Sequence, residues 1–377
     1  MYLHAISFFD FMDFIPLARP DITPEDIAAA EKVLLSGMLV QGLNVEKLEK
    51  NISEFTGCKH TVAVSNGTAT MHLALTVLEI GKGDEVIVPA FSYVATANVV
   101  ELVGAKPVFI DIEPDTFNIN ASEIEKHITK NTKAIIAVHE FGMACDIEKI
   151  ASIAKNYNIY LIEDAACALG AMQNGKYVGT FGDFGSFSLH PRKAISSGEG
   201  GLVTTRNSDF AKRVKILRNH GIDMVDEKIE FVAAGFNYRL TDFQAALVNN
   251  QLKRLEQIIA FKQKLALVYF DQVKNKKITL PFISHGMNHT WQSFHIMLDE
   301  SIDRDKTIGL LKEKNIGTNY GAQCIPFQKY YRDKYAIDCL KNFPVAMKAY
   351  TKGLAIPIYE RLTEDNISYI ASQLNTL

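Results

Sequence analysis

The sequence has few cysteines, almost no excess charge of either sign and no long hydrophobic run. Its five cysteines are scattered over 377 residues without a Cys-x-x-Cys pair, so we expect no disulfide framework and a cytoplasmic location. Lys and Arg total 40 against 43 Asp and Glu, which argues against nucleic acid or an anionic membrane as a partner. The apolar stretch 3–17 lacks a basic start and contains Asp10 and Asp13, so we expect neither a signal peptide nor a membrane span. No motif indicates a role for residues 1–14.

The remaining composition is that of an ordinary globular protein, with 47% hydrophobic and 22% charged residues. At roughly 150 residues per domain, the length predicts about two domains. The first helix is expected to begin at Pro24, after the capping residue Thr23, and to end at Gly37.

Short apolar runs rich in β-branched residues alternate with helical segments as far as residue 205. These runs cover residues 60–65, 85–89, 106–110, 133–139, 159–162, 185–189 and 201–205. Such alternation predicts an α/β fold with a mostly parallel central sheet flanked by helices on both faces. Sheets of this kind bind ligands at the carboxyl ends of their strands.

The rest of the chain predicts long helices and then a smaller α/β unit. We expect helices at 208–220 and 241–277, a strand at 292–298, helices near 303–314 and 341–350, and a last helix after Thr363. The predicted domains are a large domain, residues 1–260, and a small C-terminal domain, residues 261–377.

An acid and a lysine follow two of the predicted strands. Asp164 ends the run that begins at residue 159, and Lys193 follows the run 185–189. Pyridoxal phosphate chemistry requires this pair, because a lysine holds the cofactor as an imine and an acid keeps the pyridine nitrogen protonated. A lone lysine after a strand is more often a solvated surface charge, so the argument depends on the residues around it.

Other residues at the same sheet edge would complete a cofactor site. Gly67 and Thr68 open a helix directly after a strand, and free N–H groups at a helix start bind phosphate, although Gly-Thr there is often a simple cap. Tyr93 follows the strand at 85–89 and could stack on a planar cofactor or lie in the core. His139 ends a strand and could line the pocket or be a structural histidine.

Two competing signals are weak. The segment from Gly170 to Lys176 imitates the start of a phosphate-binding loop, but Tyr177 stands where a magnesium-binding hydroxyl is required. The histidines and cysteines form no recognisable four-ligand set, so we expect no metal site.

Five segments carry a further signal: Glu163-Asp-Ala-Ala166, Ser188 to Lys193, Gly198-Glu-Gly-Gly201, Leu217 to Gly221 and Gly235 to Asp242. Taken together, they resemble the DegT/DnrJ/StrS sugar aminotransferases. These are fold-type I pyridoxal phosphate enzymes, and the resemblance runs from about Ile15 to the C-terminus. It implies Lys193 as the imine-forming catalytic lysine, Asp164 as the partner of the pyridine nitrogen, and Tyr93 as the stacking ring.

The resemblance also implies residues for the phosphate, the partner subunit and the substrates. Gly67, Thr68 and Ser188 would hold the phosphate, and Asn237 would reach the phosphate in the other subunit of a homodimer with shared active sites. Arg239 becomes a candidate for the donor's carboxylate, with a surface ion pair as the alternative. His139 and His220 are further candidates for contact with the substrate.

The resulting hypothesis is a homodimeric aminotransferase that converts a nucleotide-linked keto-deoxysugar to an amino sugar. The resemblance implies L-glutamate as donor and a product used for lipopolysaccharide, O-antigen or another surface glycan. A sugar dehydratase or lyase is an alternative, although relatives that dehydrate sugars carry histidine where this chain has Lys193; a catalytically silent pyridoxal phosphate-binding regulator is another. Cys167, Leu169 and Met143 replace residues that are often polar in relatives, so neither the sugar and nucleotide nor the aminated carbon, 3 or 4, follows from the sequence.

Overall fold

A seven-stranded sheet forms the centre of the computed structural model, which describes residues 14–283 and 287–377. The strand order is β1-β10-β9-β6-β5-β2-β4. β10 pairs antiparallel with both neighbours and the other pairs are parallel, which confirms the predicted mostly parallel sheet. The strands are β1 (His60–Val64), β2 (Glu85–Pro89), β4 (Lys106–Ile110), β5 (Thr132–Val138), β6 (Tyr160–Asp164), β9 (Phe184–Ser188) and β10 (Gly201–Thr205). Residues 1–13, for which no motif indicates a role, lie outside the described residues.

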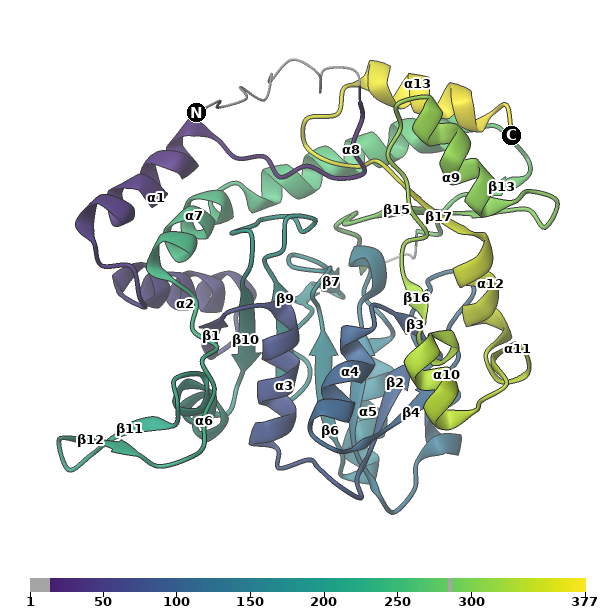
Figure 1. Ribbon diagram of the computed structural model, residues 1–377. Helices are drawn as coiled ribbons and strands as arrows, with labels where there is room; N and C mark the ends of the chain where they lie inside the picture. The colour runs from purple at the N-terminus through teal and green to yellow at the C-terminus, as the bar shows by residue number, and fades with distance from the viewer. Residues whose placement is uncertain (1–13, 284–286) are drawn as a thin grey trace, which may run out of the picture.

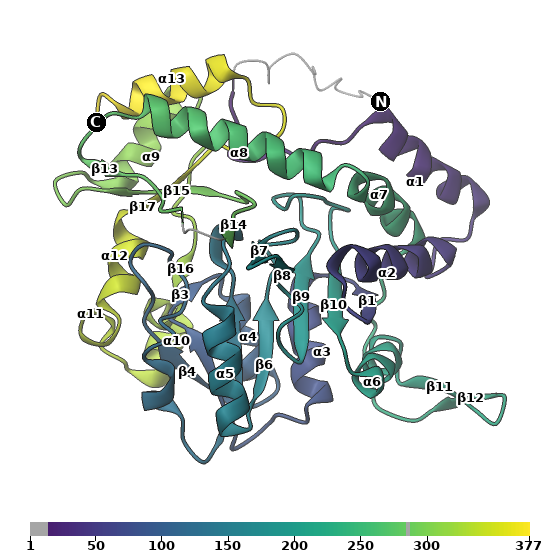
Figure 2. The ribbon, with the colours of Figure 1, turned by 180° about the vertical axis from the view of Figure 1, so that it is seen from behind.

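Helices cover both faces of the sheet because its strands are apolar on both sides. Alternate residues of one strand enter different clusters, so that Val86 and Val88 pack on one face and Ile87 on the other. The helices of this part of the chain are α1 (Pro24–Ser36), α2 (Leu43–Thr56), α3 (Gly67–Val77), α4 (Ala95–Leu102), α5 (Ile147–Tyr157), α6 (Ser208–Arg218) and α7 (Asp242–Leu252), with 3-10 turns η1 (Ile124–His127) and η2 (Glu140–Gly142). α3 and α4 lie side by side on one face (Figure 1) and α5 covers the other (Figure 2).

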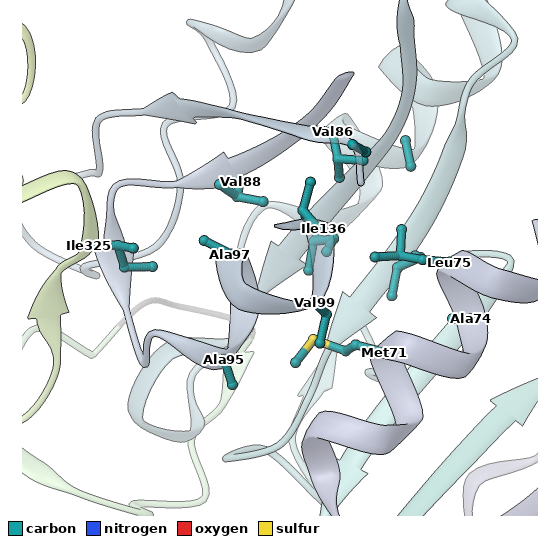
Figure 3. Close-up of a cluster of buried hydrophobic side chains, with 14 of the residues drawn as sticks. Met71, Ala74, Leu75, Val86, Val88, Ala95, Ala97, Val99, Ile136 and Ile325 are labelled. Carbon is teal, nitrogen blue, oxygen red and sulfur yellow. The ribbon is translucent and has the colours of Figure 1, made fainter. Parts of the chain in front are cut away.

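The largest core lies between the sheet and helices α3 and α4 (Figure 3). Met71 and Leu75 of α3 and Val99 of α4 face Ile136 of the sheet there. Ile325, from far along the chain, lies at the edge of the same cluster. Part of the predicted small domain therefore packs directly on the large core.

That C-terminal part pairs with the large domain through a short strand. β16 (Gln323–Cys324) is antiparallel to β3 (Phe91–Ser92), and apolar side chains from the segment that follows complete the large core. The elements of this segment are η3 (Ile325–Phe327), α10 (Lys329–Tyr335), α11 (Cys339–Asn342) and α12 (Pro344–Lys352).

The other C-terminal elements form a second core around a small antiparallel sheet. Its order is β13-β15-β17, with bounds Ile278–Thr279, Phe294–Leu298 and Gly353–Ile356. α8 (Leu255–Gln272), α9 (Arg304–Glu313) and α13 (Glu364–Leu374) pack against it. The proposed boundary at 260/261 falls inside α8, whose first half packs with Leu255 in the large domain and whose second half packs with Tyr269 in the small one.

The sequence predicts the strands of the central sheet within a few residues, but several other elements differ from the prediction or were not predicted. Residues 241–277 form two helices, α7 and α8, rather than one. α2 was not predicted; it has Gly42 at its N-cap, and Asp242 of α7 accepts the N–H groups of Asn44 and Val45, both at 3.0 Å. The hairpin β11 (Ile222–Val225) and β12 (Lys228–Phe231) was also not predicted, and it projects from the body of the protein (Figures 1 and 2).

Another small sheet has three strands. It joins β14 (Met287–Asn288), β7 (Met172–Gln173) and β8 (Lys176–Tyr177). Within residues 14–283 and 287–377, no helix combines the length and apolar character needed to cross a membrane.

Candidate active site

The parallel strands bring the predicted site residues to one edge of the sheet. β1 ends before Gly67, β6 ends at Asp164, β9 ends at Ser188 and β5 ends before His139. These strands run in the same direction, so all four carboxyl ends meet at that edge. This is where ligands bind in sheets of this class.

Asp164 is buried and held by two hydrogen bonds. Its Oδ2 accepts from the hydroxyl of Thr96 at 2.9 Å and its Oδ1 accepts from the N–H of Ala166 at 3.2 Å. Burial raises the pKa of Asp164, while the Thr96 and Ala166 bonds and the charge of Lys193 oppose that rise. Each oxygen keeps a further lone pair, so the carboxylate can also accept a pyridine N–H.

Lys193 reaches the same place from the loop that follows β9. Its Nζ donates to Sγ of Cys167 at 3.0 Å, and its charge acts on Asp164. Burial raises the pKa of the Cys167 thiol, so the lysine rests against a neutral thiol. The position of Cys167 beside the reactive amine is a finding that the sequence alone did not give.

The start of α3 approaches Ser188 closely enough to form an anion cradle. A Cβ on Gly67 would lie 2.9 Å from Cβ of Ser188, so only glycine permits this approach. Asn66 caps the N–H of Ala69 at 2.8 Å, and in the described part of the chain the N–H groups of Gly67 and Thr68 have no protein acceptor. These groups fit a phosphate.

Tyr93 and Asn237 are both exposed in the isolated chain. The ring of Tyr93 is 65% exposed, whereas its neighbour Phe91 is fully buried in the core. The alternative that Tyr93 is a core residue is therefore excluded. Asn237 lies on the segment that runs beside the end of β1, where Val64 bridges to Arg239.

Arg239 and His220 are placed differently from each other. Arg239 is half-buried, and its Nη1 donates to Oδ1 of Asn219 at 2.6 Å, so it makes no surface ion pair with an acid among the described residues. His220 is exposed in a tight turn with φ of 56°. No contact of His220 links it to Asp164 or Lys193.

His139 is buried, and both of its ring nitrogens are hydrogen-bonded. It is 0% exposed; its Nδ1 accepts from the N–H of Cys145 at 3.2 Å, and its Nε2 lies 3.1 Å from Oε2 of Glu163. Because Nδ1 accepts, the proton is on Nε2 and is donated to Glu163. The imidazole offers no atom to a substrate, which corresponds to the structural alternative for this residue.

Glu163 and Asp164 are neighbours with different surroundings. Glu163 accepts the N–H groups of Gly179, Phe181 and Gly182 at 2.7, 2.7 and 2.8 Å. Its carboxylate therefore fixes the turn before β9, while Asp164 remains available to a ligand.

A segment of the small domain fixes the loops of the large one. The N–H of Thr290 donates to the carbonyl of Gly142 at 2.9 Å, and Nε2 of Gln292 donates to the carbonyl of Arg192 at 3.1 Å. The second bond holds the loop that carries Lys193. Sequence reasoning missed Thr96, Ser92 and Glu140, although Glu140 follows an apolar strand run and could have been noticed there.

The residues at this edge fit pyridoxal phosphate. Asp164 provides an acceptor for the ring nitrogen, Lys193 an amine for the aldehyde, and the α3 cradle donors for the phosphate. Leu169 packs in the core beside α7 and α8, and Met143 lines a small cavity with Glu140 and Phe141. Among the described residues, no group of three or more His, Cys, Asp or Glu side chains could hold a metal ion.

Comparisons with known proteins find relatives over nearly the whole chain. An uncharacterized protein of Methanocaldococcus jannaschii, MJ1066, is 37% identical over 367 residues, which cover 94% of this chain and 95% of the relative. The putative sugar aminotransferase Spr1654 of Streptococcus pneumoniae, solved in PLP and PMP forms, is 28% identical with a TM-score of 0.90; its PLP form covers 96% of this chain and 98% of its own. Helicobacter pylori PseC, an aminotransferase involved in the biosynthesis of pseudoaminic acid, is 27% identical with a TM-score of 0.91, covering 96% of this chain and 98% of its own.

A family model matches almost the whole chain. The match extends over residues 20–375 and is to the DegT/DnrJ/EryC1/StrS aminotransferase family, whose aminotransferases use pyridoxal phosphate. With the fold and the cofactor site described above, the match shows that this chain belongs to the DegT/DnrJ/EryC1/StrS family of pyridoxal phosphate-dependent aminotransferases.

Proposed function

We propose that this enzyme transfers the amino group of L-glutamate to a nucleotide-linked keto-deoxysugar, for the synthesis of a surface glycan such as lipopolysaccharide or O-antigen. The observation that carries the proposal is the placement of Lys193 and Asp164 at one sheet edge beside the α3 cradle. The similarity to PseC supports a sugar as acceptor. The cytoplasmic location expected from the cysteines remains a prediction.

The side chains divide the work between binding and proton transfer. When bound, pyridoxal phosphate withdraws electrons from the carbon that carries the substrate nitrogen. Asp164 holds a proton on the ring nitrogen through its carboxylate. Nζ of Lys193 removes the proton from the α-carbon of the donor and returns it elsewhere, as general base and then general acid. The N–H groups of Gly67 and Thr68, with Ser188, bind the phosphate.

Tyr93 and Arg239 complete the proposed pocket. The exposed ring of Tyr93 stacks on the cofactor. Arg239 uses one nitrogen for Asn219, and its remaining donors can bind the carboxylate of glutamate in a forked arrangement. We leave His139 out of this pocket because it is enclosed.

A second copy of the chain belongs to the proposal. α1, α2 and the turn between them expose Leu35, Met38 and Leu43 at 82%, 76% and 80%, and the hairpin exposes Ile229 and Phe231 at 66% and 71%. An apolar surface of this kind marks an interaction site. Pairing of two chains through it would cover these side chains and carry Asn237 toward the phosphate of the partner's site.

The test is turnover with defined substrates. Purified enzyme with pyridoxal phosphate and L-glutamate is offered a panel of nucleotide-linked 3-keto and 4-keto deoxysugars, and 2-oxoglutarate and the amino sugar are measured by mass spectrometry. Formation of both in equal amounts with one sugar supports the proposal. Loss of water or of another group from the sugar without 2-oxoglutarate would favour a dehydratase or lyase, and binding without turnover would favour a regulator.

A further inference from the structure

Cys167 contacts the amine of Lys193, and none of the steps above uses it. Nζ of Lys193 donates to Sγ of Cys167 at 3.0 Å. In the part of the chain that the structure describes, this amine forms no ion pair with a carboxylate. The two residues come from neighbouring strands of the sheet, since Cys167 follows β6 and Lys193 follows β9. The hydrogen-bond partner of the lysine is therefore a thiol and not an acid.

One segment of the small domain fixes the backbone on both sides of this contact. Oγ1 of Thr290 donates to the carbonyl of Cys167 at 3.4 Å. Two residues further on, Nε2 of Gln292 donates to the carbonyl of Arg192, the residue before Lys193, at 3.1 Å. Because the same short segment holds both backbones, the separation of Sγ and Nζ does not depend on the two side chains alone.

The chemistry of the site requires a place for the free amine. To remove a proton from the α-carbon of the donor, Nζ of Lys193 must be released from the cofactor and still remain within reach. A free lysine side chain has four rotatable bonds and loses much conformational entropy when it is held in one position. A hydrogen bond from a fixed neighbour offsets that cost, and in this chain the free Nζ is directed at Cys167.

A thiol suits this task better than a carboxylate would. Burial raises the pKa of Cys167, against the opposing charge and hydrogen bond of Lys193, so the thiol is neutral. A carboxylate in contact with Nζ would favour the ammonium form, which cannot take up a proton. A neutral thiol is a weak acceptor for an ammonium and, through its S–H, a weak donor to a neutral amine. It can therefore remain the partner of Lys193 before and after the proton moves.

We propose that Cys167 is a positioning residue that holds the free amine of Lys193 in place for proton transfer. Its role in the reaction rests on the proposed function, whereas the contact between thiol and amine does not. The two parts are therefore tested separately, the contact without cofactor and the role with it.

Infrared spectroscopy of the cofactor-free protein tests the contact. The difference spectrum between wild type and Cys167→Ala isolates the S–H stretching band of Cys167. We expect this band to shift in Lys193→Met, because the amine beside the thiol is gone. The control Lys176→Met removes a lysine that lies over the ring of Phe181 at 4.0 Å, and it should leave the band in place. A band that is the same in Lys193→Met and wild type would overturn the proposal.

The role is tested with protein loaded with pyridoxal phosphate and an amino donor that carries hydrogen or deuterium on its α-carbon. Stopped-flow absorbance follows the first half-reaction. Loss of the hydrogen bond in Cys167→Ala should slow this step by about tenfold and raise its isotope effect. Cys167→Ser should stay within about threefold of the wild type, because a hydroxyl also accepts and donates. The control Cys58→Ala removes a buried thiol before β1 and should keep the wild-type isotope effect.

The isotope effect separates positioning from a structural role. A residue that only supports the fold would lower the melting temperature or the affinity for pyridoxal phosphate and leave the isotope effect unchanged. An unchanged isotope effect in Cys167→Ala, or a Cys167→Ser variant as slow as Cys167→Ala, would overturn the proposal. The comparison uses whichever amino acid the wild type converts, so failure of L-glutamate counts against the proposed donor alone. If the wild type converts no amino acid, the proposed function fails and takes the role of Cys167 with it, while the infrared result still decides the contact.

Discussion

Glu163 and Asp164 are adjacent acids for which the structure predicts opposite effects of an amide substitution. In Glu163→Gln, either orientation of the amide places its NH₂ against two donors, because Oε1 accepts from Phe181 and Gly182 and Oε2 accepts from Gly179 and His139. Two buried or half-buried N–H donors then lose their acceptor, each at a cost of about 1–3 kcal/mol. Breaking such a buried charged network costs ~3–5 kcal/mol in total.

Hydrogen exchange measures this loss locally. A decrease of ~3–5 kcal/mol corresponds to exchange that is faster by about two to four orders of magnitude, and we expect it at the amides of residues 179–182 in the cofactor-free protein. The matched control is Glu148→Gln, an exposed carboxyl whose bond to Asn174 is 3.0 Å long, which should leave these amides unchanged.

Asp164→Asn should behave differently in the same experiment. The amide can still accept from Ala166, and the hydroxyl of Thr96 can rotate to accept from the NH₂, so protection should change by about 1 kcal/mol or less while transamination is lost. The reasoning is refuted if Glu163→Gln leaves exchange at residues 179–182 within threefold of the wild type, or if Asp164→Asn retains full turnover.

Four further changes test other parts of the account. Lys193→Ala should abolish transamination with an unchanged circular dichroism spectrum; turnover above one hundredth of the wild-type rate would exclude the lysine as the proton carrier. Gly67→Ala should weaken pyridoxal phosphate binding by about tenfold, because its Cβ would come within 2.9 Å of Cβ of Ser188. The control Gly309→Ala, which has open space around its Cβ, should not change the affinity in the same titration. Burial raises the pKa of Glu140 to about 8, against an ordinary value of 4.5. The free energy of unfolding of the wild type should therefore fall by up to ~5 kcal/mol relative to that of Glu140→Gln as the pH rises from about 4.5 to 8. A difference in urea midpoint between the two proteins that stays constant between pH 5 and 8.5 would contradict this. Leu35→Glu should shift the protein from dimer to monomer in sedimentation velocity, and a wild type that sediments as a monomer would remove that surface from the proposal.

The sequence predicted the strands of the central sheet well because the signal for a buried strand is local. Buried parallel strands are continuous apolar runs, and the bounds of β2, β4 and β10 agree with the prediction residue for residue. Helix α1 was likewise given by Thr23 at its start and Gly37 at its end.

The differences come from contacts between distant parts of the chain. α2 depends on Asp242 for its cap, and the segment that begins at Cys324 joins the large core through packing that no local pattern reveals.

Local motifs likewise predicted the residues with familiar chemistry but not their partners. Asp164 and Lys193 were identified from their places after strands, but the Thr96 bond to Asp164 spans 68 residues. His139 at a strand end was open to either reading, and only its contacts with Glu163 and Cys145 distinguish them. Glu140 also follows a predicted strand, but no local pattern places it near Asp164 and Lys193.

The central claim is that Lys193 and Asp164 form a working transamination site, and the first half-reaction tests it most directly. Absorbance of the pyridoxal phosphate-loaded enzyme is recorded before and after addition of L-glutamate, with Lys193→Ala in parallel. We predict that the visible band of the wild type gives way to the near-ultraviolet band of the pyridoxamine form, with one equivalent of 2-oxoglutarate, and that Lys193→Ala does not convert. A loaded wild-type enzyme whose spectrum does not change with L-glutamate or any other amino acid offered would contradict the account.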